Sequence, residues 1–303
     1  MVNLWNCPTF YFSVLIKAFL QLLSNNAIYY LKIFDNMNKT KIPCSMTIAG
    51  SDSGAGAGIQ ADLLTFASHG VYGTTAISAI TAQNPNMVSA VSAPDSDILA
   101  KQMNAIADFY EIKSAKTGML FDAKLIKVVA DFFKSHKEIK LVLDPVMIST
   151  SGAKLLKDDA IEMLETALIP LAEVITPNLD EGAVLLNVDK IVDVEESAKA
   201  LAKKYTVNVL LKGGHLESDD IFDVLATPQG DINILKSKRI PNINTHGSGC
   251  TLSASIASNL AKGFSLLQSC KYAQEYIVAT MKNPLETAGE KFINHFPNKW
   301  VRH

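Results

Sequence analysis

Runs typical of β-strands alternate with amphipathic helical runs over most of this chain, from residue 42 to residue 211. A strand, a crossover helix and a second strand form a parallel pair, because parallel strands need a long connection. Repetition of this unit predicts a mainly parallel sheet with helices on both faces, which is an α/β fold. The expected strands are 42–49, 74–82, 115–120, 141–143, 174–176 and 207–211, and the expected helices are 59–70, 95–110, 123–136, 159–171 and 194–205.

The pattern changes after residue 211. Two β-type runs, 221–226 and 232–238, flank a Pro-Gln-Gly turn signal and predict a hairpin, and two helical runs follow. No internal repeat or low-complexity linker interrupts the chain, so we expect a single folded domain. The expected boundaries are an extension at 1–45, the domain at 46–290 and a tail at 291–303.

The extension is rich in apolar residues, but its stretch 10–23 is interrupted by Lys17 and Gln21. This stretch is shorter than the roughly 20 residues that a spanning helix needs, and the extension lacks a basic start and a cleavage site. It could be an amphipathic surface helix, a poor membrane anchor, or sequence upstream of the true start. We favour the third interpretation, because Met37 precedes a polar run that suits the opening of the first strand.

The charge and cysteine content exclude several classes of protein. The formal net charge is −2, and no basic stripe indicates a nucleic-acid partner. The four cysteines, at 7, 44, 250 and 270, are far apart and form no CxxC pair. We therefore expect a protein of the reducing cytoplasm, with no membrane or nucleic-acid partner.

A glycine-rich segment at 245–251, Thr-His-Gly-Ser-Gly-Cys-Thr, precedes a run with helical spacing. The first amides of a helix lack intrahelical acceptors, and the macrodipole is positive there. Such a helix start binds anions, phosphate above all, which predicts an anion site at Gly247, Ser248 and Gly249. Cys250 falls in the first turn, where the same field favours the thiolate. The alternative is an ordinary glycine-rich helix start with a buried cysteine.

A second glycine-rich loop, 54–58, joins the first expected strand to its helix and predicts close approach of backbone to a ligand. Its spacing does not match the GxGxxG pattern of dinucleotide-binding folds. Gln83 follows the next expected strand, where its amide could read the donors and acceptors of a heterocycle. The alternative there is a plain turn, because Asn84 and Pro85 follow.

Three further polar groups follow the ends of expected strands. Asp144 lies where open α/β sheets bind their ligands. Asn178 and Glu181 form an N-x-x-E pattern of hard ligands suited to Mg²⁺, although the same pattern also suits a helix capping box. Lys212 could contact a phosphate, or it could merely extend from a strand end to solvent. Together with the helix start these groups form the inventory of a phosphoryl-transfer site, without a P-loop or a protein-kinase motif.

Seven motifs in order resemble those of the ribokinase-like superfamily of small-molecule kinases. Within it they are most similar to the hydroxymethylpyrimidine/phosphomethylpyrimidine kinases of thiamine biosynthesis. The motifs are IAGSDSGAGAGIQAD (48–62), AQN (82–84), KTGML (116–120), LDPVM (143–147), TPNLDE (176–181), LLKGGH (210–215) and THGSGCTLSA (245–254). The resemblance implies a three-layer αβα sandwich around a mainly parallel sheet.

The resemblance also implies roles for individual residues. Cys250 occupies the general-base position, with Gly247, Ser248 and Gly249 beside it. The positions that match the pyrimidine contacts are Gly50, Asp62, Gln83, Met119 and Val146. Those that match the ATP contacts are Asn178, Lys212, Thr245, Gly247 and Gly249, and those on the magnesium side are Asp144 and Glu181.

The implied activity is ATP-dependent phosphorylation of 4-amino-5-hydroxymethyl-2-methylpyrimidine and then of its monophosphate, with Mg²⁺. The alternatives are a pyridoxal kinase, because some of these also carry the cysteine, and a non-catalytic pyrimidine-binding protein. Gln83 favours the pyrimidine. The resemblance further implies a homodimer.

Overall fold

The computed structural model describes residues 41–147, 156, 158–214 and 219–297. The predicted extension at 1–45 therefore lies almost wholly outside the described residues. Within the unit 43–303, a nine-stranded sheet has the order β3-β2-β1-β4-β5-β6-β7-β8-β9. Its strands are β1 (Cys44–Ser51), β2 (Tyr72–Asn84), β3 (Met87–Ser92), β4 (Ile112–Thr117), β5 (Lys140–Leu143), β6 (Val174–Ile175), β7 (Asn208–Leu211), β8 (Asp220–Ala226) and β9 (Ile232–Lys238).

The central strands β2, β1, β4, β5, β6 and β7 are parallel, as the alternation predicts. The hairpin β8–β9 adds antiparallel strands at one edge, and β3 pairs antiparallel with β2 at the other. Strand β3 was not predicted, since the turn signal at residues 84–86 hid it. A short antiparallel pair, β10 (Leu285–Thr287) and β11 (Glu290–Phe292), lies near the end of the chain.

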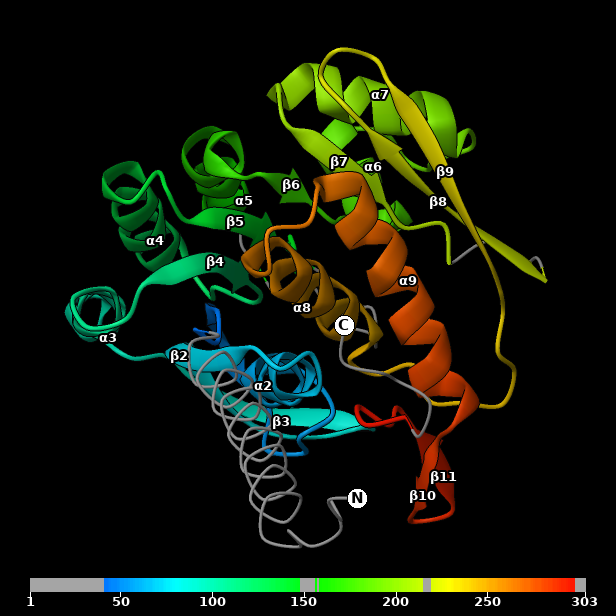
Figure 1. Ribbon diagram of the computed structural model, residues 1–303. Helices are drawn as coiled ribbons and strands as arrows, with labels where there is room; N and C mark the ends of the chain where they lie inside the picture. The colour runs from blue at the N-terminus through cyan, green and yellow to red at the C-terminus, as the bar shows by residue number, and fades with distance from the viewer. Residues whose placement is uncertain (1–40, 148–155, 157, 215–218, 298–303) are drawn as a thin grey trace, which may run out of the picture. The chain divides into compact units, whose positions relative to one another are not determined.

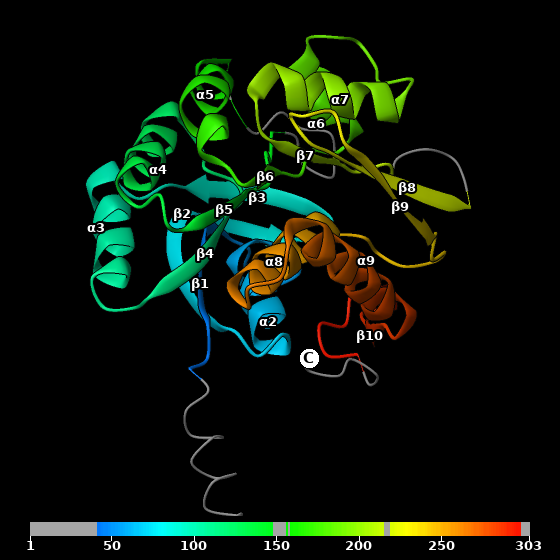
Figure 2. The same ribbon diagram turned by 45° about the horizontal axis from the view of Figure 1, so that its top comes forward.

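Helices cover both faces of the sheet, which gives the expected three layers (Figures 1 and 2). One face is covered by α2 (Gly58–Ser68), α8 (Ser248–Ala261) and α9 (Leu266–Lys282). The other face is covered by α3 (Ser96–Ala107), α4 (Ala123–Ser135), α5 (Asp158–Met163), α6 (Leu179–Leu186) and α7 (Val194–Tyr205). Two hydrophobic clusters follow this division, because the side chains of each helix layer pack on their own face of the sheet.

Two helical regions differ from the sequence prediction. The expected helix at 159–171 begins as α5 but continues as a π-helical turn (Leu164–Leu168) and a 3-10 turn (Ile169–Leu171). Pro170 cannot donate a backbone hydrogen bond, which suits this tightened end. The start of helix α6 was predicted only as an alternative, since Asn178 and Glu181 suited either a helix capping box or a Mg²⁺ site. Among the described residues, no helix has the length and apolar character needed to cross a membrane.

The parallel strands point their carboxyl ends to the same edge of the sheet. Asp52 directly follows β1, Asp144 follows β5 and Lys212 follows β7. An isolated parallel bridge joins Asn178 to Lys212 and extends this edge beyond β6. Open α/β sheets bind ligands at such an edge. The fold therefore gathers groups from distant parts of the sequence in one place.

Candidate active site

The glycine-rich segment forms the start of α8, as predicted. Gly247 is the N-cap and has a φ of 80°. A Cβ there would lie 1.8 Å from the carbonyl oxygen of Gly56, so only glycine fits this contact. The first helical bond runs from the Thr251 amide to the Gly247 carbonyl (2.9 Å). The amides of Gly249 and Cys250 precede it and lie at the positive end of the helix.

Lys212 and Asp144 lie against this helix start. The Lys212 Nζ is 3.0 Å from Asp144 Oδ1. A Cβ built on Gly249 would lie 3.3 Å from Lys212 Nζ and 3.6 Å from Asp144 Oδ2, so the ion pair faces the bare backbone of the first helical turn. A side chain at 249 would fill this place. The arrangement joins a helix N-terminus, a cation and a carboxylate, which suits a phosphate and its counterion.

Asn178 and Glu181 form a helix capping box, which the sequence suggested as the alternative to a pair of Mg²⁺ ligands. Asn178 Oδ1 accepts from the Glu181 amide and Glu181 Oε2 accepts from the Asn178 amide, both at 2.8 Å. The pKa of Glu181 is raised to about 7, because the effect of burial, to which Asp144 adds, outweighs the lowering effect of Lys212. The nearby charges that perturb it place this carboxyl beside the Lys212–Asp144 pair. The capping role is therefore compatible with a role in the site.

Cys250 lies among charged groups, and its pKa differs from the sequence expectation. Burial raises the pKa of its thiol, and the carboxylates of Asp62 and Asp144 act in the same direction. The Lys116 ammonium and a hydrogen bond from the Gly58 amide lower it, but they do not outweigh the burial. The helix field alone predicted a thiolate. The desolvation of the sulfur outweighs that field, so the pKa of the thiol is raised instead of lowered.

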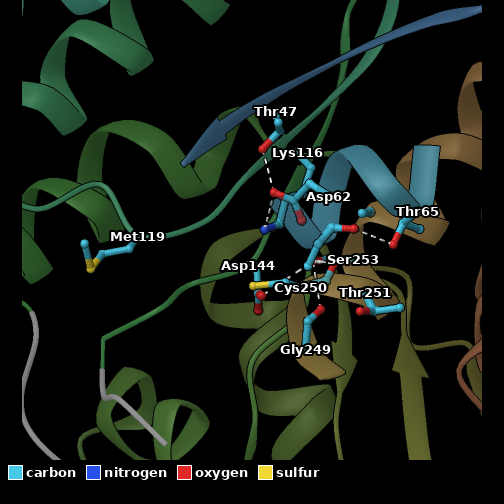
Figure 3. Close-up of polar contacts among 12 residues, drawn as sticks. Thr47, Asp62, Thr65, Lys116, Met119, Asp144, Gly249, Cys250, Thr251 and Ser253 are labelled. Atoms are coloured by element: carbon cyan, nitrogen blue, oxygen red, sulfur yellow. Dashed lines mark hydrogen bonds and ion pairs between the residues drawn. The ribbon is translucent and has the colours of Figure 1, made fainter. Parts of the chain in front are cut away.

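A fully buried ion pair lies behind Cys250 (Figure 3). Lys116 Nζ is 2.9 Å from Asp62 Oδ2, both side chains have 0% exposure, and Thr47 Oγ1 donates to the same carboxylate oxygen at 2.6 Å. Asp62 Oδ1 is buried and has no hydrogen-bond partner among the described residues. The expected substrate contact of Asp62 stays a prediction. In the structure its side chain has 0% exposure and is the counterion of Lys116.

The other expected substrate-binding residues occupy separate strand ends. The terminal methyl of Met119 would be 3.2 Å from a Cβ on Gly50, so these two residues lie together at the ends of β4 and β1. Val146 is half-buried and follows Asp144 by two residues. Thr245, which was expected to contact ATP, is exposed, and its carbonyl accepts from the Ser248 amide at 3.0 Å. Gln83 is half-buried at the end of β2, where the pairing with β3 shifts register.

Sequence reasoning missed the contacts that tie the two glycine-rich segments together. His246 Nε2 lies 2.9 Å from Asp52 Oδ2, although 194 residues separate them. The ring also packs on Gly56, where a Cβ would be 2.6 Å from its Cδ2. The histidine stood inside the motif at 245–251, but no sequence pattern paired it with Asp52. Lys116 was likewise missed, because a lysine within a strand gives no signal that it is buried.

The carboxylates at this edge fit Mg²⁺ in number and kind. No group of three or more histidine, cysteine or acidic side chains that could hold a metal occurs among the described residues. Mg²⁺ keeps several waters and often binds through one or two carboxylates together with substrate phosphates. Asp144 and Glu181 are both buried, and Lys212 lies beside Asp144, so the two carboxylates satisfy that requirement.

Comparison with known proteins relates this geometry to one family. The sequence profile of the family described as phosphomethylpyrimidine kinase matches residues 52–294. The hydroxymethylpyrimidine/phosphomethylpyrimidine kinase of Haemophilus influenzae is 42% identical over 257 residues, which cover 83% of this chain and 96% of the relative. The chloroplastic thiamine biosynthetic bifunctional enzyme TH1 of Arabidopsis thaliana is 39% identical over 241 residues, 78% of this chain and 46% of that protein.

A solved structure shows the same fold. The ADP complex of Bacillus subtilis pyridoxal kinase superposes with a TM-score of 0.77 at 34% identity, covering 85% of this chain and 98% of that one. The match with that structure therefore spans most of the chain.

Proposed function

The chain belongs to the phosphomethylpyrimidine kinase family, and from that premise we propose how its site performs the reaction. The chain is an ATP-dependent kinase that phosphorylates 4-amino-5-hydroxymethyl-2-methylpyrimidine and then its monophosphate, in thiamine biosynthesis. One observation carries the assignment of the site: the start of α8 faces the Lys212–Asp144 pair, with Cys250 in its first turn. This is an anion site next to a proton-transfer group.

Different residues of this chain contribute to different parts of the phosphoryl transfer. The hydroxymethyl oxygen attacks the γ-phosphorus, the bond to the β,γ-bridging oxygen breaks, and ADP leaves with that oxygen. The amides of Gly247, Gly249 and Cys250 stabilise the charge of the transferring group, whereas the Ser248 amide is bonded to the Thr245 carbonyl. Lys212 neutralises the phosphates. We expect Asn178 and Thr245 to contact the nucleotide, since both match ATP contacts of the family.

As the thiolate, Cys250 accepts the proton of the acceptor hydroxyl, and as the thiol it orients that hydroxyl toward the phosphorus. The transition state of phosphoryl transfer is largely dissociative, so the proton leaves late and a strong base is not needed at the outset. Lys116 lowers the pKa of the thiol, which increases the share of the thiolate, the form of the sulfur that can accept a proton. Asp62 keeps Lys116 in place for this purpose.

Asp144 and Glu181 would hold Mg²⁺ together with the ATP phosphates. When bound, this ion supplies the positive charge that offsets the charge of the phosphates during transfer. Glu181 keeps its capping bond to Asn178 in this arrangement, and so would act through its remaining oxygen or through water.

The decisive assay measures ADP release with the pyrimidine, its monophosphate and pyridoxal offered side by side. We expect the two pyrimidines to be used with much higher kcat/KM than pyridoxal. Release of ADP with pyridoxal alone would instead assign the second candidate function, pyridoxal kinase, which the likeness to the Bacillus subtilis enzyme favours. No ADP release with any acceptor would indicate a non-catalytic pyrimidine-binding protein.

The proposal also covers the oligomeric state of the protein and its cellular compartment. Strands β2 and β3 expose apolar side chains at one edge of the sheet, including Ile80 (59%), Met87 (56%) and Val88 (43%). Such an edge suits pairing with a second copy of the chain, and we expect a cytoplasmic homodimer. Light scattering of the purified protein tests the dimer, and a monomer at micromolar concentration would contradict it.

A further inference from the structure

Asp52 is an ionised acceptor that three donors hold in one orientation. Its Oδ1 accepts from the Gly54 amide (2.7 Å), and its Oδ2 accepts from the Ala57 amide (2.9 Å) and meets His246 Nε2 (2.9 Å). Burial favours the neutral acid, but these hydrogen bonds outweigh it and hold the pKa of Asp52 below its usual value. The carboxylate therefore offers only lone pairs to the histidine ring.

This contact decides where the ring carries its proton. A carboxylate cannot donate, so the 2.9 Å contact is a hydrogen bond only if His246 Nε2 carries a hydrogen. That holds both for the neutral ring protonated at Nε2 and for the imidazolium. The close packing of the ring on Gly56 keeps this nitrogen directed at Asp52. His246 is thus a fixed donor at the edge of the expected substrate-binding residues.

Gln83 meets the same ring nitrogen. Its backbone is held on both sides by Ser53, whose Oγ accepts from the Gln83 amide and donates to the Gln83 carbonyl, each at 2.7 Å. Its side-chain Nε2 lies 3.3 Å from His246 Nε2. Two N–H donors cannot bond each other, whereas a half-turn of the carboxamide brings its oxygen to that place. The oxygen can then share the Nε2 hydrogen with Asp52.

We propose that His246, held by Asp52, is a positioning residue that fixes the carboxamide of Gln83 with its oxygen toward the ring and its NH₂ group away from it. The inference rests on the proposed function, in which Gln83 reads the pyrimidine. A fixed carboxamide presents one acceptor and one donor in a set order. The amino group of the substrate matches the acceptor, and the adjacent ring nitrogen matches the donor.

The consequence is discrimination between an aminopyrimidine and its 4-oxo analogue. The oxo analogue presents a carbonyl and a ring N–H at the same two places, so both contacts become mismatched against the fixed carboxamide. A carboxamide that was free to turn over would satisfy either compound equally well. His246 therefore determines specificity without touching the substrate.

The first test compares kcat/KM for the aminopyrimidine and the 4-oxo analogue in His246→Leu and His246→Gln. Leucine removes the donor, so the ratio of the two kcat/KM values should fall roughly tenfold, which corresponds to the loss of about one hydrogen bond. Glutamine keeps an N–H that can reach both Asp52 and Gln83, so it should retain most of the ratio. An unchanged ratio in a folded His246→Leu protein would overturn the proposal.

A second measurement does not depend on activity. The ¹⁵N NMR spectrum of the histidine-labelled protein reports which ring nitrogen is protonated, and His246→Gln identifies the signal among the six histidines. We expect a proton on Nε2, and a bare Nε2 in the folded protein would overturn the proposal. If the wild type phosphorylates neither pyrimidine, the proposed function fails, while this spectrum still decides whether the positioning contact exists.

Discussion

Two lysine–aspartate pairs lie near Cys250, and they differ in their access to a ligand. Lys116 and Asp62 both have 0% side-chain exposure, and their closest atoms are 2.9 Å apart. Lys212 keeps 16% exposure against 3% for Asp144, at nearly the same distance of 3.0 Å. The chemistry of the two pairs is the same, but only the second can exchange its partner for a phosphate.

The difference separates a structural charge from a functional one. In an ion pair without solvent access, each charge is stabilised only by its partner and by neighbouring protein groups, because water cannot solvate it. The Lys116 ammonium then acts at a distance, through the field that it exerts on the Cys250 thiol. Lys212 stands instead beside the bare backbone of Gly249, where an incoming phosphate would meet it. Substitutions at the two lysines should therefore affect different properties.

The largest expected effect is on stability, at the sealed pair. Lys116→Met leaves the Asp62 carboxylate buried without its counterion, which should lower the free energy of unfolding by about 3–5 kcal/mol in urea titrations. The double variant Lys116→Met with Asp62→Leu removes both charges and should recover much of the loss. A single variant as stable as the wild type would show that the pair is not sealed in solution.

The next effect is on catalysis, at the accessible pair. Lys212→Met should lower kcat/KM for ATP roughly 10²–10³-fold, since it removes one charge from the phosphate site. Stability should fall less than in Lys116→Met, because Asp144 still accepts from Thr176 Oγ1 (3.2 Å). Steady-state kinetics and urea titration of the same preparations provide the comparison. Equal losses of stability in Lys116→Met and Lys212→Met would contradict the distinction between a sealed pair and an accessible pair.

A smaller effect concerns the pH dependence of stability at Glu181. Its pKa is raised from 4.5 to about 7, so the folded state binds a proton that the unfolded state releases. The resulting stability is fully present below pH 4.5 and should be lost as the pH rises through about 7, by roughly 3 kcal/mol. Glu181→Gln should remove this slope. Unfolding titrations from pH 4.5 to 8 measure it, and identical slopes in both proteins would contradict the prediction.

Mg²⁺ with ATP should largely suppress this loss of stability with rising pH in the wild type. A bound cation favours the ionised carboxylate, so the complex should lose little stability as the pH rises to 7. The same addition should leave the pH slope of Glu181→Gln unchanged. A wild-type slope that ligands do not alter would remove Glu181 from the magnesium side of the site.

The sequence predicted the sheet because its strands are buried and separated by amphipathic helices, which are local patterns. It also predicted the helix start at Gly247, since glycines before a helical run have few other uses. It could not predict that Lys116 seals Asp62, because the two residues belong to β4 and α2, which lie apart in the chain. The bond between His246 and Asp52 spans 194 residues and has no local signature.

The pKa of Cys250 teaches the same lesson. The position of the cysteine in the first helical turn predicted a lowered value, and that local argument omits the desolvation that the rest of the fold imposes. The capping box of Asn178 and Glu181 was legible in the sequence, but only as one of two alternatives. Local rules thus identified which residues gather, and the tertiary structure determined their charge states.

The central claim is that the start of α8 holds the transferring phosphoryl group while Cys250 handles the proton. Its most direct test is Cys250→Ala, with ATP affinity measured by calorimetry and turnover by ADP release, and with the buried Cys270→Ala as the matched control. We predict an unchanged Kd for ATP and a kcat lowered at least about 100-fold, whereas Cys270→Ala keeps its turnover. Full activity of Cys250→Ala would contradict the account.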